Sequence, residues 1–214
     1  MTFLLDVISY NFKASELTIF RDNDALISGL SCNLNSGNCC IISGSNGIGK
    51  STLLRAIAGL RSSFVGSISL SKDDIRISKE DINNHIAYQG HKIGISENLT
   101  VKDNIHFFSG LYNSDLKKTD FFIRQFSLSG LLNRKVDSLS AGEQKRVAIV
   151  CAFLKNASFW LLDEPSINLD ADGCSALNLF IKQKLKQGSI FLIATHNLNQ
   201  FKEIGTHQLE LDSS

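Results

Sequence analysis

The residues with the clearest chemical potential follow a short apolar segment early in the chain. The segment "NCCIIS" (38–43) precedes "GSNGIGKST" (44–52), which matches the pattern G-x-x-x-x-G-K-[ST] between a predicted strand and a predicted helix. Glycines let such a loop turn its backbone N–H groups inward, and the helix start adds the positive end of its dipole. The loop therefore predicts a site for a triphosphate.

Side chains of this loop have separate predicted roles. Lys50 is expected to reach the β- and γ-phosphates as a point charge, and the Ser51 hydroxyl to bind Mg²⁺, which prefers hard oxygen ligands. Thr52 is placed to help with the α-phosphate. The other predicted phosphate-binding residues are Gly44, Ser45, Asn46, Gly47, Ile48 and Gly49. A glycine-rich turn opening an ordinary helix is the alternative, but the complete pattern and its flanks favour phosphate binding.

Two adjacent carboxylates form a second candidate site. "FWLLDEPSINLD" (159–170) places Asp163 and Glu164 at the end of an apolar run, where open α/β sheets bind their ligands. Asp163 is suited to the shell of a magnesium ion. Glu164 is suited to accept a proton from an attacking water molecule or to orient it. Two solvated carboxylates are the alternative, which the nearby phosphate loop disfavours.

These groups need an α/β core to position them. Three runs without polar alternation, 38–43, 158–163 and 189–194, predict strands of a parallel sheet covered on both faces. Helical spacing at 50–59, 143–155 and 172–187 predicts helices between them, and Gly59 and Gly188 are placed as helix stops. Residues 96–138 have helix-compatible spacing and no continuous strand-like run, which predicts a small helical insertion.

Composition excludes several classes of protein. The 214 residues suit one domain, and 22 Lys and Arg against 21 Asp and Glu give a formal charge of +1, so no field favours nucleic acid. The five cysteines form no C-x-x-C pair and indicate a reducing compartment. No stretch approaches about 18 uninterrupted apolar residues, so we expect a chain that is neither exported nor membrane-spanning.

The motifs together resemble the nucleotide-binding domains of ATP-binding cassette (ABC) proteins. The phosphate loop and acidic strand end are joined by "LSAGEQKRVAIV" (139–150) before the carboxylates and "ATH" (194–196) after them, and the resemblance spans nearly the whole chain. It implies a P-loop fold of ABC type: a mostly parallel central sheet flanked by helices, a small antiparallel β region, and a helical subdomain at about 96–138 within a single domain, 1–214.

The same resemblance assigns further site residues. It makes His196 the switch histidine and Phe20 an adenine-stacking aromatic, with Tyr10 as a competitor for the second role. A histidine capping the end of a strand is the alternative for His196. The implied signature comprises Ser140, Ala141, Gly142 and Glu143, and the implied D-loop comprises Asn168, Leu169 and Asp170. Relatives often have Gln at the position of Glu143, whose carboxylate would repel a triphosphate unless it points away or is protonated.

A glutamine between the core and the helical insertion contacts Mg²⁺ and the attacking water in this family. In "IAYQGHKIG" (86–94), spacing from "LTV" (99–101) favours His91 for that position, while Gln89 lies two residues earlier. Alternate strand residues face the same way, and a one-residue bulge would exchange them, so both stay candidates. The stretches "GSNGIGKSTLLR", "GHKIGI" and "LSAGEQKRVA" look most like those of ATP-binding subunits of haem exporters in bacterial cytochrome c maturation.

The resemblance also implies activity, partners and location. Two copies would sandwich two ATP molecules with Mg²⁺ head to tail, so that Ser140 and its helix address the γ-phosphate held by the other copy. Closure and ATP hydrolysis would drive separately encoded transmembrane permease subunits, with the chain peripheral on the cytoplasmic face of the bacterial inner membrane. The alternatives are the ATPase of a different ABC transporter, a soluble cassette ATPase, or a non-hydrolysing adaptor, and no nucleic-acid partner is expected.

Overall fold

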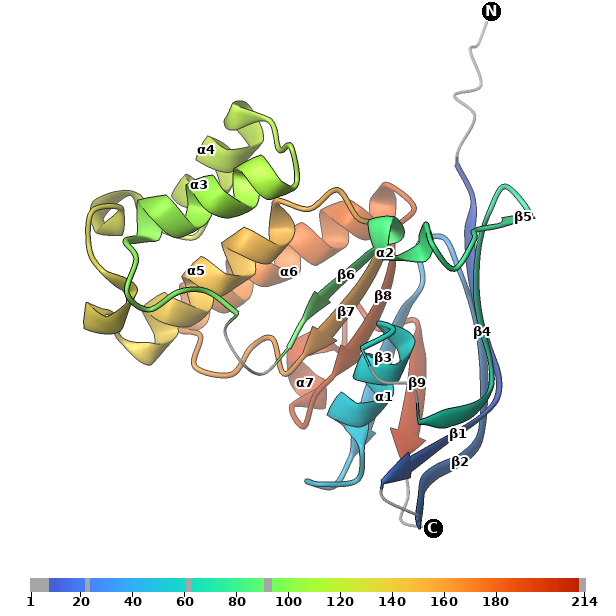
Figure 1. Cartoon of the computed structure of the whole chain (residues 1–214). Coiled ribbons are helices and arrows are strands. Elements are labelled where there is room, and N and C mark those ends of the chain that lie inside the picture. Colours follow the sequence, from blue (N-terminus) through green and yellow to red (C-terminus); the bar gives the residue numbers. More distant parts are fainter. Residues whose placement is uncertain (1–7, 22–23, 61–62, 91–93, 212–214) are drawn as a thin grey trace, which may run out of the picture.

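The structure is a computed structural model that describes residues 8–21, 24–60, 63–90 and 94–211. It holds a five-stranded parallel sheet and a four-stranded antiparallel sheet. Figure 1 shows the antiparallel sheet on one side, helices α3 and α4 on the opposite side, and the parallel sheet between them. The α/β class, the parallel sheet and the separate antiparallel region predicted above are confirmed.

The parallel sheet has the strand order β6-β7-β8-β3-β9. Its strands are β3 (Cys39–Gly44), β6 (Ile86–Gln89), β7 (Phe159–Asp163), β8 (Ile190–Ala194) and β9 (His207–Leu211). The three strands predicted from apolar runs, β3, β7 and β8, are the central ones. Every residue of β7 and β8 is buried, which explains why these segments show no polar alternation.

Both faces of the sheet are covered, each by its own apolar cluster. Trp160 and Leu162 of β7 join one cluster, which includes residues of α5 and α6. Phe159 and Leu161 of the same strand join the other cluster, which includes residues of α1 and the antiparallel sheet. Successive side chains of a strand point to opposite faces, so one five-residue strand contributes to both layers.

The antiparallel sheet has the order β2-β1-β4-β5. Its strands are β1 (Tyr10–Arg21), β2 (Asp24–Asn35), β4 (Phe64–Lys72) and β5 (Ile75–Arg76). Phe12, Ala14, Leu17 and Ile19 of β1 are buried, and the residues between them are exposed or half-buried, so this sheet covers α1 with one face. Helix α1 (Lys50–Ile57) contacts strands of both sheets.

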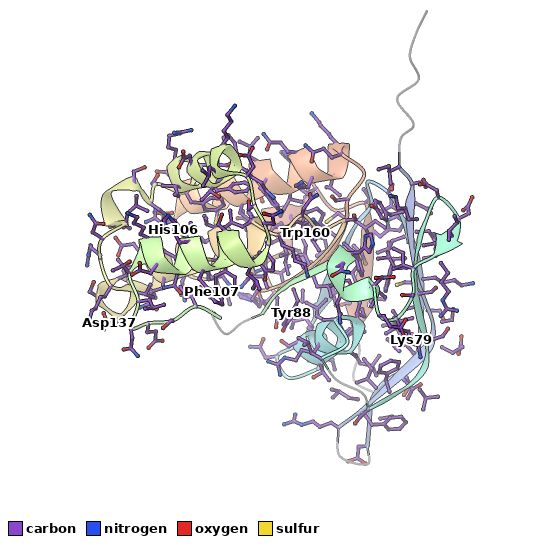
Figure 2. All side chains as sticks on the ribbon, turned by 45° about the horizontal axis from the view of Figure 1, so that its top comes forward. Lys79, Tyr88, His106, Phe107, Asp137 and Trp160 are labelled. Carbon is purple, nitrogen blue, oxygen red and sulfur yellow. The ribbon has the colours of Figure 1, made fainter. Side chains whose placement is uncertain are left out.

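Two long helices cover the other face of the parallel sheet. They are α5 (Ala141–Phe153) and α6 (Ala171–Lys186), and their rings of Phe153 and Phe180 stack with centroids 3.4 Å apart. Trp160 meets both rings edge-on from the sheet, inside the molecule (Figure 2). The short helices α2 (Ile82–His85) and α7 (Leu198–Phe201) lie before β6 and between β8 and β9.

The insertion predicted at about 96–138 contains helical elements. They are α3 (Val101–Leu111), α4 (Leu116–Gln125) and the 3-10 turns η1 (Ser129–Leu131) and η2 (Val136–Ser138). Thr100 caps α3 with its side chain and pairs with Lys135 in an isolated bridge, which ties the two ends of the segment together. Among the described residues, no helix combines the length and apolarity that crossing a membrane requires.

Candidate active site

The candidate site lies at the carboxyl edge of the parallel sheet. Ile42 of β3 and Asp163 of β7 both pair with Ala194 of β8, so the residues that follow these three strands meet at the same edge. The phosphate loop follows β3, Glu164 follows β7, and His196 follows β8 by two residues. Three segments that are far apart in the sequence therefore converge because their strands are adjacent and parallel.

The phosphate loop takes a backbone path that requires glycine at two tight points. Gly44 has φ 142°, and an added Cβ would lie 2.6 Å from the Leu211 carbonyl oxygen. Gly49 has φ 112°, and an added Cβ would lie 2.8 Å from the Leu26 side chain. Both angles lie in the region that side chains disfavour, so the loop needs these glycines for its own packing as well as for phosphate approach.

Lys50 begins α1 and spans the loop with its side chain. Its ammonium donates hydrogen bonds to the carbonyl oxygens of Gly44, at 2.8 Å, and Ser45, at 3.1 Å. The residue is only 8% exposed. A Lys ammonium has three donors, so one remains for a phosphate oxygen while the loop fixes the position of the other two.

Asp163 supplies the chemistry that a magnesium ion would need. It is 1% exposed, and its Oδ2 has no hydrogen-bond partner. Together with the Ser51 hydroxyl on the same cavity, it presents hard oxygen ligands, so the residues fit Mg²⁺. No group of three His, Cys, Asp or Glu in the described ranges is placed to hold a metal ion.

Glu164 and His196 are in direct contact. The Nδ1 atom of His196 lies 3.0 Å from Oε2 of Glu164, and the Glu164 side chain is 13% exposed against 57% for His196. Glu164 has φ 48°, and its N–H donates to the Ala194 carbonyl at 2.9 Å, which extends the pairing beyond β7. An ionised carboxylate only accepts hydrogen bonds, so the tautomer that fits this contact carries its proton on Nδ1.

One cavity of about 650 Å³ collects these groups. The predicted residues that line it are Asn46, Gly47, Gly49, Lys50, Ser51, Thr52, Asp163, Glu164 and His196. It is also lined by Arg21, Arg55 and Ile167, which the sequence analysis missed. Arg55 lies four residues after Ser51 on α1, so helical periodicity was a usable signal for it, whereas Arg21 belongs to no motif.

The aromatic residue proposed for adenine lies beside this cavity without lining it. Phe20 is half-buried near the end of β1, its N–H donates to the Ser63 carbonyl at 3.3 Å, and its neighbour Arg21 does line the cavity. Tyr10 begins the same twelve-residue strand, and its ring lies 6.0 Å from that of His85. Of the two aromatics, only Phe20 is at the phosphate-loop end of β1.

The signature residues form the start of α5. Ser140 is the N-cap: its Oγ accepts from the Glu143 N–H at 3.3 Å, and Glu143 Oε2 accepts from the Ser140 N–H at 2.8 Å. The backbone hydrogen bond from Ser140 is the main cause that lowers the pKa of Glu143. The carboxylate is therefore ionised and folded back onto its own helix, and none of the signature residues 140–143 lines the cavity of the same chain.

The D-loop packs against this helix start. Asn168 has φ 65°, and a Cβ added to Gly142 would lie 2.6 Å from the Asn168 carbonyl oxygen. Asp170 caps α6 by accepting from the Gly173 N–H at 2.9 Å, and its other oxygen lies 3.8 Å from Arg146 of α5. The loop after β7 and the start of α5 therefore form one packed unit, with half-buried Leu169 against the larger core cluster.

Of the two candidates in 86–94, only Gln89 lies among the described residues. Gln89 ends β6 and is 5% exposed, its Nε2 donates to the Gly90 carbonyl at 2.6 Å, and its Oε1 has no partner. It does not line the phosphate-loop cavity. His91, which was the preferred candidate, lies outside the described residues, so the choice between the two stays a prediction.

Gln89 instead lines a second, smaller cavity of about 270 Å³. This groove is bounded by β6, α3 and α5, with Tyr88, Phe108, Tyr112 and Lys155 among its walls. Tyr88 lies at the edge between the helical segment and the core (Figure 2). Arg55 lines both cavities, and its Nε lies 3.5 Å from the Tyr88 hydroxyl.

A parallel sheet with a phosphate loop after one central strand, and with paired carboxylates at the end of another central strand separated from the first by β8, defines a P-loop nucleoside triphosphatase. Sequence comparison specifies the class further. The profile of the family described as "ABC transporter" matches residues 27–167. The chain belongs to the ABC transporter family, as one of its ATP-binding, ATP-hydrolysing subunits.

Individual relatives agree with the profile. The chain is 35% identical over 184 residues to the "Cytochrome c biogenesis ATP-binding export protein CcmA" of Escherichia coli, covering 86% of this chain and 88% of that protein. It is 33% identical to the protein of the same name from Shewanella frigidimarina, covering 86% of this chain and 85% of that one.

Solved structures show the same fold. The "ATP binding subunit of ABC transporter" superposes with a TM-score of 0.82 at 24% identity, covering 94% of this chain and 85% of that one. A "Putative ABC transporter (ATP-binding protein)" from Pyrococcus furiosus superposes with a TM-score of 0.79 at 22% identity, covering 95% of this chain and 100% of that one.

Proposed function

We propose that this chain is the MgATP-hydrolysing subunit of a transporter in which ATP-driven closure of a dimer is coupled to separate membrane subunits, and that this transporter is a haem exporter of cytochrome c biogenesis. The observation that carries the ATPase role is the single cavity shared by Lys50, Asp163, Glu164 and His196. The names of the E. coli and Shewanella relatives support the role in cytochrome c biogenesis.

The chemistry follows from the residues of the cavity. Lys50 and the inward N–H groups of 44–52 hold the β- and γ-phosphates, and the Ser51 hydroxyl and Asp163 would hold Mg²⁺. A bound Mg²⁺ neutralises charge on the β- and γ-phosphate oxygens. Glu164 takes the proton of the water that attacks the γ-phosphorus, the bond from that phosphorus to the β–γ bridging oxygen breaks, and ADP leaves. His196 holds the Glu164 carboxylate through Nδ1.

A second copy of the chain completes the proposed site. Ser140 and Ala141 are exposed, and the signature does not reach the phosphate loop of its own chain. The cap uses the N–H groups of Ser140 and Glu143, so the donors proposed for an incoming γ-phosphate are the Ser140 hydroxyl and the N–H groups of Ala141 and Gly142. Asn168, Leu169 and Asp170 follow the catalytic strand and are the proposed contacts between the two copies.

The proposed contact with the membrane subunits is the groove beside Gln89, which Gly94 also lines. It joins the helical segment to the core, and its Arg55 also borders the nucleotide cavity. We further propose that 1–214 form a single nucleotide-binding domain whose segment 96–138 moves as a subdomain, and that the protein works at the cytoplasmic face of the bacterial inner membrane. Phe20 is the proposed adenine contact.

The test uses a tagged Glu164→Gln chain held in MgATP and expressed in its native membranes. We expect ATP binding to be retained, turnover to fall by about 10² or more because the general base is lost, and membrane subunits of a cytochrome c maturation complex to co-purify with two copies of the chain. The unchanged chain and Lys50→Ala, which should lose most of its affinity for phosphate, are the controls. Mass spectrometry identifies the partners, and light scattering counts the copies.

Each possible result tests a different part of the proposed function. Undiminished turnover in Glu164→Gln would remove Glu164 as the base. A permease of another kind would keep the transporter ATPase and discard haem export, whereas ribosomes or no membrane partner would favour a soluble cassette ATPase.

A further inference from the structure

Lys145 is a buried cation that the chemistry above does not use. It lies in the second turn of α5 and is 5% exposed. Within the described part of the chain, its side chain makes no hydrogen bond and no ion pair, whereas the other buried lysine, Lys50, donates two hydrogen bonds to the phosphate loop. A lysine that is almost wholly buried loses most of the hydration of its ammonium, so its position needs an electrostatic reason.

The packing of α5 places Lys145 beside the catalytic strand end. Gly142 contacts the Asn168 carbonyl, and Arg146 lies 3.8 Å from Asp170, so the first two turns of α5 lie along the loop that follows β7. Lys145 is three residues after Gly142, which puts it on the same side of the helix. It is also buried, so it lies on the inner side, facing the start of that loop rather than solvent.

The same face of α5 continues into the groove. Ala148 and Ala152, three and seven residues after Lys145, line the groove together with Gln89. Gln89 pairs with Leu162 across β6 and β7, one residue before Asp163. Lys145 thus lies where the catalytic strand end and the groove meet, and both Gln89 Oε1 and Asp163 Oδ2 are buried oxygens without partners.

Electrostatics agree with this placement. Burial is the main influence on the pKa of Lys145 and lowers it to about 8, while the charges of Asp163 and Glu164 act in the opposite direction and raise it. These two carboxylates are therefore within electrostatic range of the ammonium. Two neighbouring carboxylates disfavour each other's ionised form, and a cation beside them offsets that repulsion.

We propose that Lys145 is a positioning residue for ATP hydrolysis, whose ammonium offsets the paired negative charges of Asp163 and Glu164 and so holds the general base in its productive orientation. The inference rests on the proposed ATPase function and adds to it a residue outside the P-loop, the strand end and the switch histidine. Removing the charge of Lys145 should change kcat and not ATP affinity, because Lys145 does not line the nucleotide cavity and should not contact ATP.

The test compares Lys145→Met, which keeps the length and apolar stem but removes the charge, with Lys145→Arg, which keeps the charge. Lys118→Met is the matched control: burial also lowers the pKa of Lys118 to about 8, but its ammonium donates to the Leu154 carbonyl at 3.1 Å, and its neighbouring charge is Lys184 rather than a carboxylate. The full chain is assayed with MgATP at concentrations where turnover is measurable, alongside ATP affinity and the urea midpoint.

We expect Lys145→Met to lower kcat at least about ten-fold, since small misplacements of a catalytic group are costly, with KM and ATP affinity within about two-fold of the unchanged chain. Lys145→Arg should recover most of the turnover, and Lys118→Met should keep it. Lys145→Gln, which stays polar but uncharged, replaces Lys145→Met if that variant does not fold.

Three outcomes would overturn the inference: full turnover in Lys145→Met, an equal loss in Lys118→Met, or no recovery in Lys145→Arg. An unchanged chain that hydrolyses no ATP would instead contradict the proposed function itself, and the role of Lys145 would fall with it.

Discussion

Glu164 holds a left-handed backbone conformation, φ 48°, at the point where the chain leaves β7. For a residue with a side chain, this conformation costs about 1 kcal/mol of free energy. Its N–H bond to Ala194 and the buried Pro165 that follows fix the chain on either side. This conformation ends the side-chain alternation of β7 and allows the Glu164 carboxylate to contact His196.

His196 is predicted to matter for turnover and not for folding. His196→Ala removes the contact that holds Glu164 Oε2 at 3.0 Å, so kcat should fall at least about ten-fold. Its side chain is 57% exposed, so the free energy of unfolding should change by less than about 0.5 kcal/mol. Steady-state ATPase assays and urea denaturation of the same preparation measure both quantities. An unfolding change with intact turnover would make His196 a structural cap only.

The sequence predicted the location of some site residues and not of others. The phosphate loop, Asp163 and Glu164 were predicted because they lie at the ends of recognisable apolar strands, and the family resemblance added His196. The structure brings them into one cavity. Arg21 carried no such signal, because it reaches the cavity only through the pairing of β1 within the antiparallel sheet. Spacing alone could not place the side chain of Gln89, which bonds to its own loop and lines the groove.

At the scale of elements, α5 depends on a reciprocal cap at its first turn. Glu143→Ala removes the carboxylate that accepts from the Ser140 N–H and should lower the free energy of unfolding by about 1 kcal/mol, the usual size of a lost helix cap. Glu143→Gln can make the same hydrogen bond and should retain most of that stability. Urea denaturation of the three proteins measures the difference. Equal loss in both variants would show that charge, and not capping geometry, is what stabilises the helix start.

Helices and strands were predictable where the hydrophobic pattern of a single segment indicates its secondary structure. The strands β3, β7 and β8 were predicted within a residue of their bounds because both of their faces are buried. The start of α5 lies at Ala141, two residues before the predicted start, because the cap at Ser140 recruits Ala141 and Gly142 into the first turn. β9 has one buried residue in five, and its alternation of polar and apolar residues covers only "QLEL" (208–211), which is too short to predict a strand.

At the scale of the whole molecule, buried titratable groups predict how stability depends on pH. Burial lowers the pKa of Lys118 and Lys145 to about 8, so between about pH 8 and 10.5 the unfolded chain binds more protons and stability rises with pH. Burial raises the pKa of the Cys40 and Cys151 thiols to about 12, so above about pH 9 the unfolded chain loses protons that the folded chain keeps. The second effect lowers stability.

We therefore expect the free energy of unfolding to rise modestly from pH 8 to 9 and to fall between pH 9 and 12. The fall should dominate because all five cysteines are free and each has a raised pKa. Urea denaturation under a phosphine reductant at pH 7.5, 9 and 11 measures it. Cys151→Ala should flatten the alkaline fall, and a stability that kept rising to pH 11 would contradict the expectation.

The position of Arg55 has a thermodynamic consequence for ligand binding at the nucleotide cavity and the groove. One guanidinium borders both the nucleotide cavity and the groove, at the far end of the helix that Lys50 begins. A ligand that moves the Arg55 guanidinium toward one cavity would change the affinity of the other cavity for its own ligand. Linkage then requires reciprocity: the factor by which an occupant of the groove alters affinity for nucleotide equals the factor by which nucleotide alters affinity for that occupant. If Arg55 couples the two cavities, the order in which the ligands arrive does not change the size of the effect.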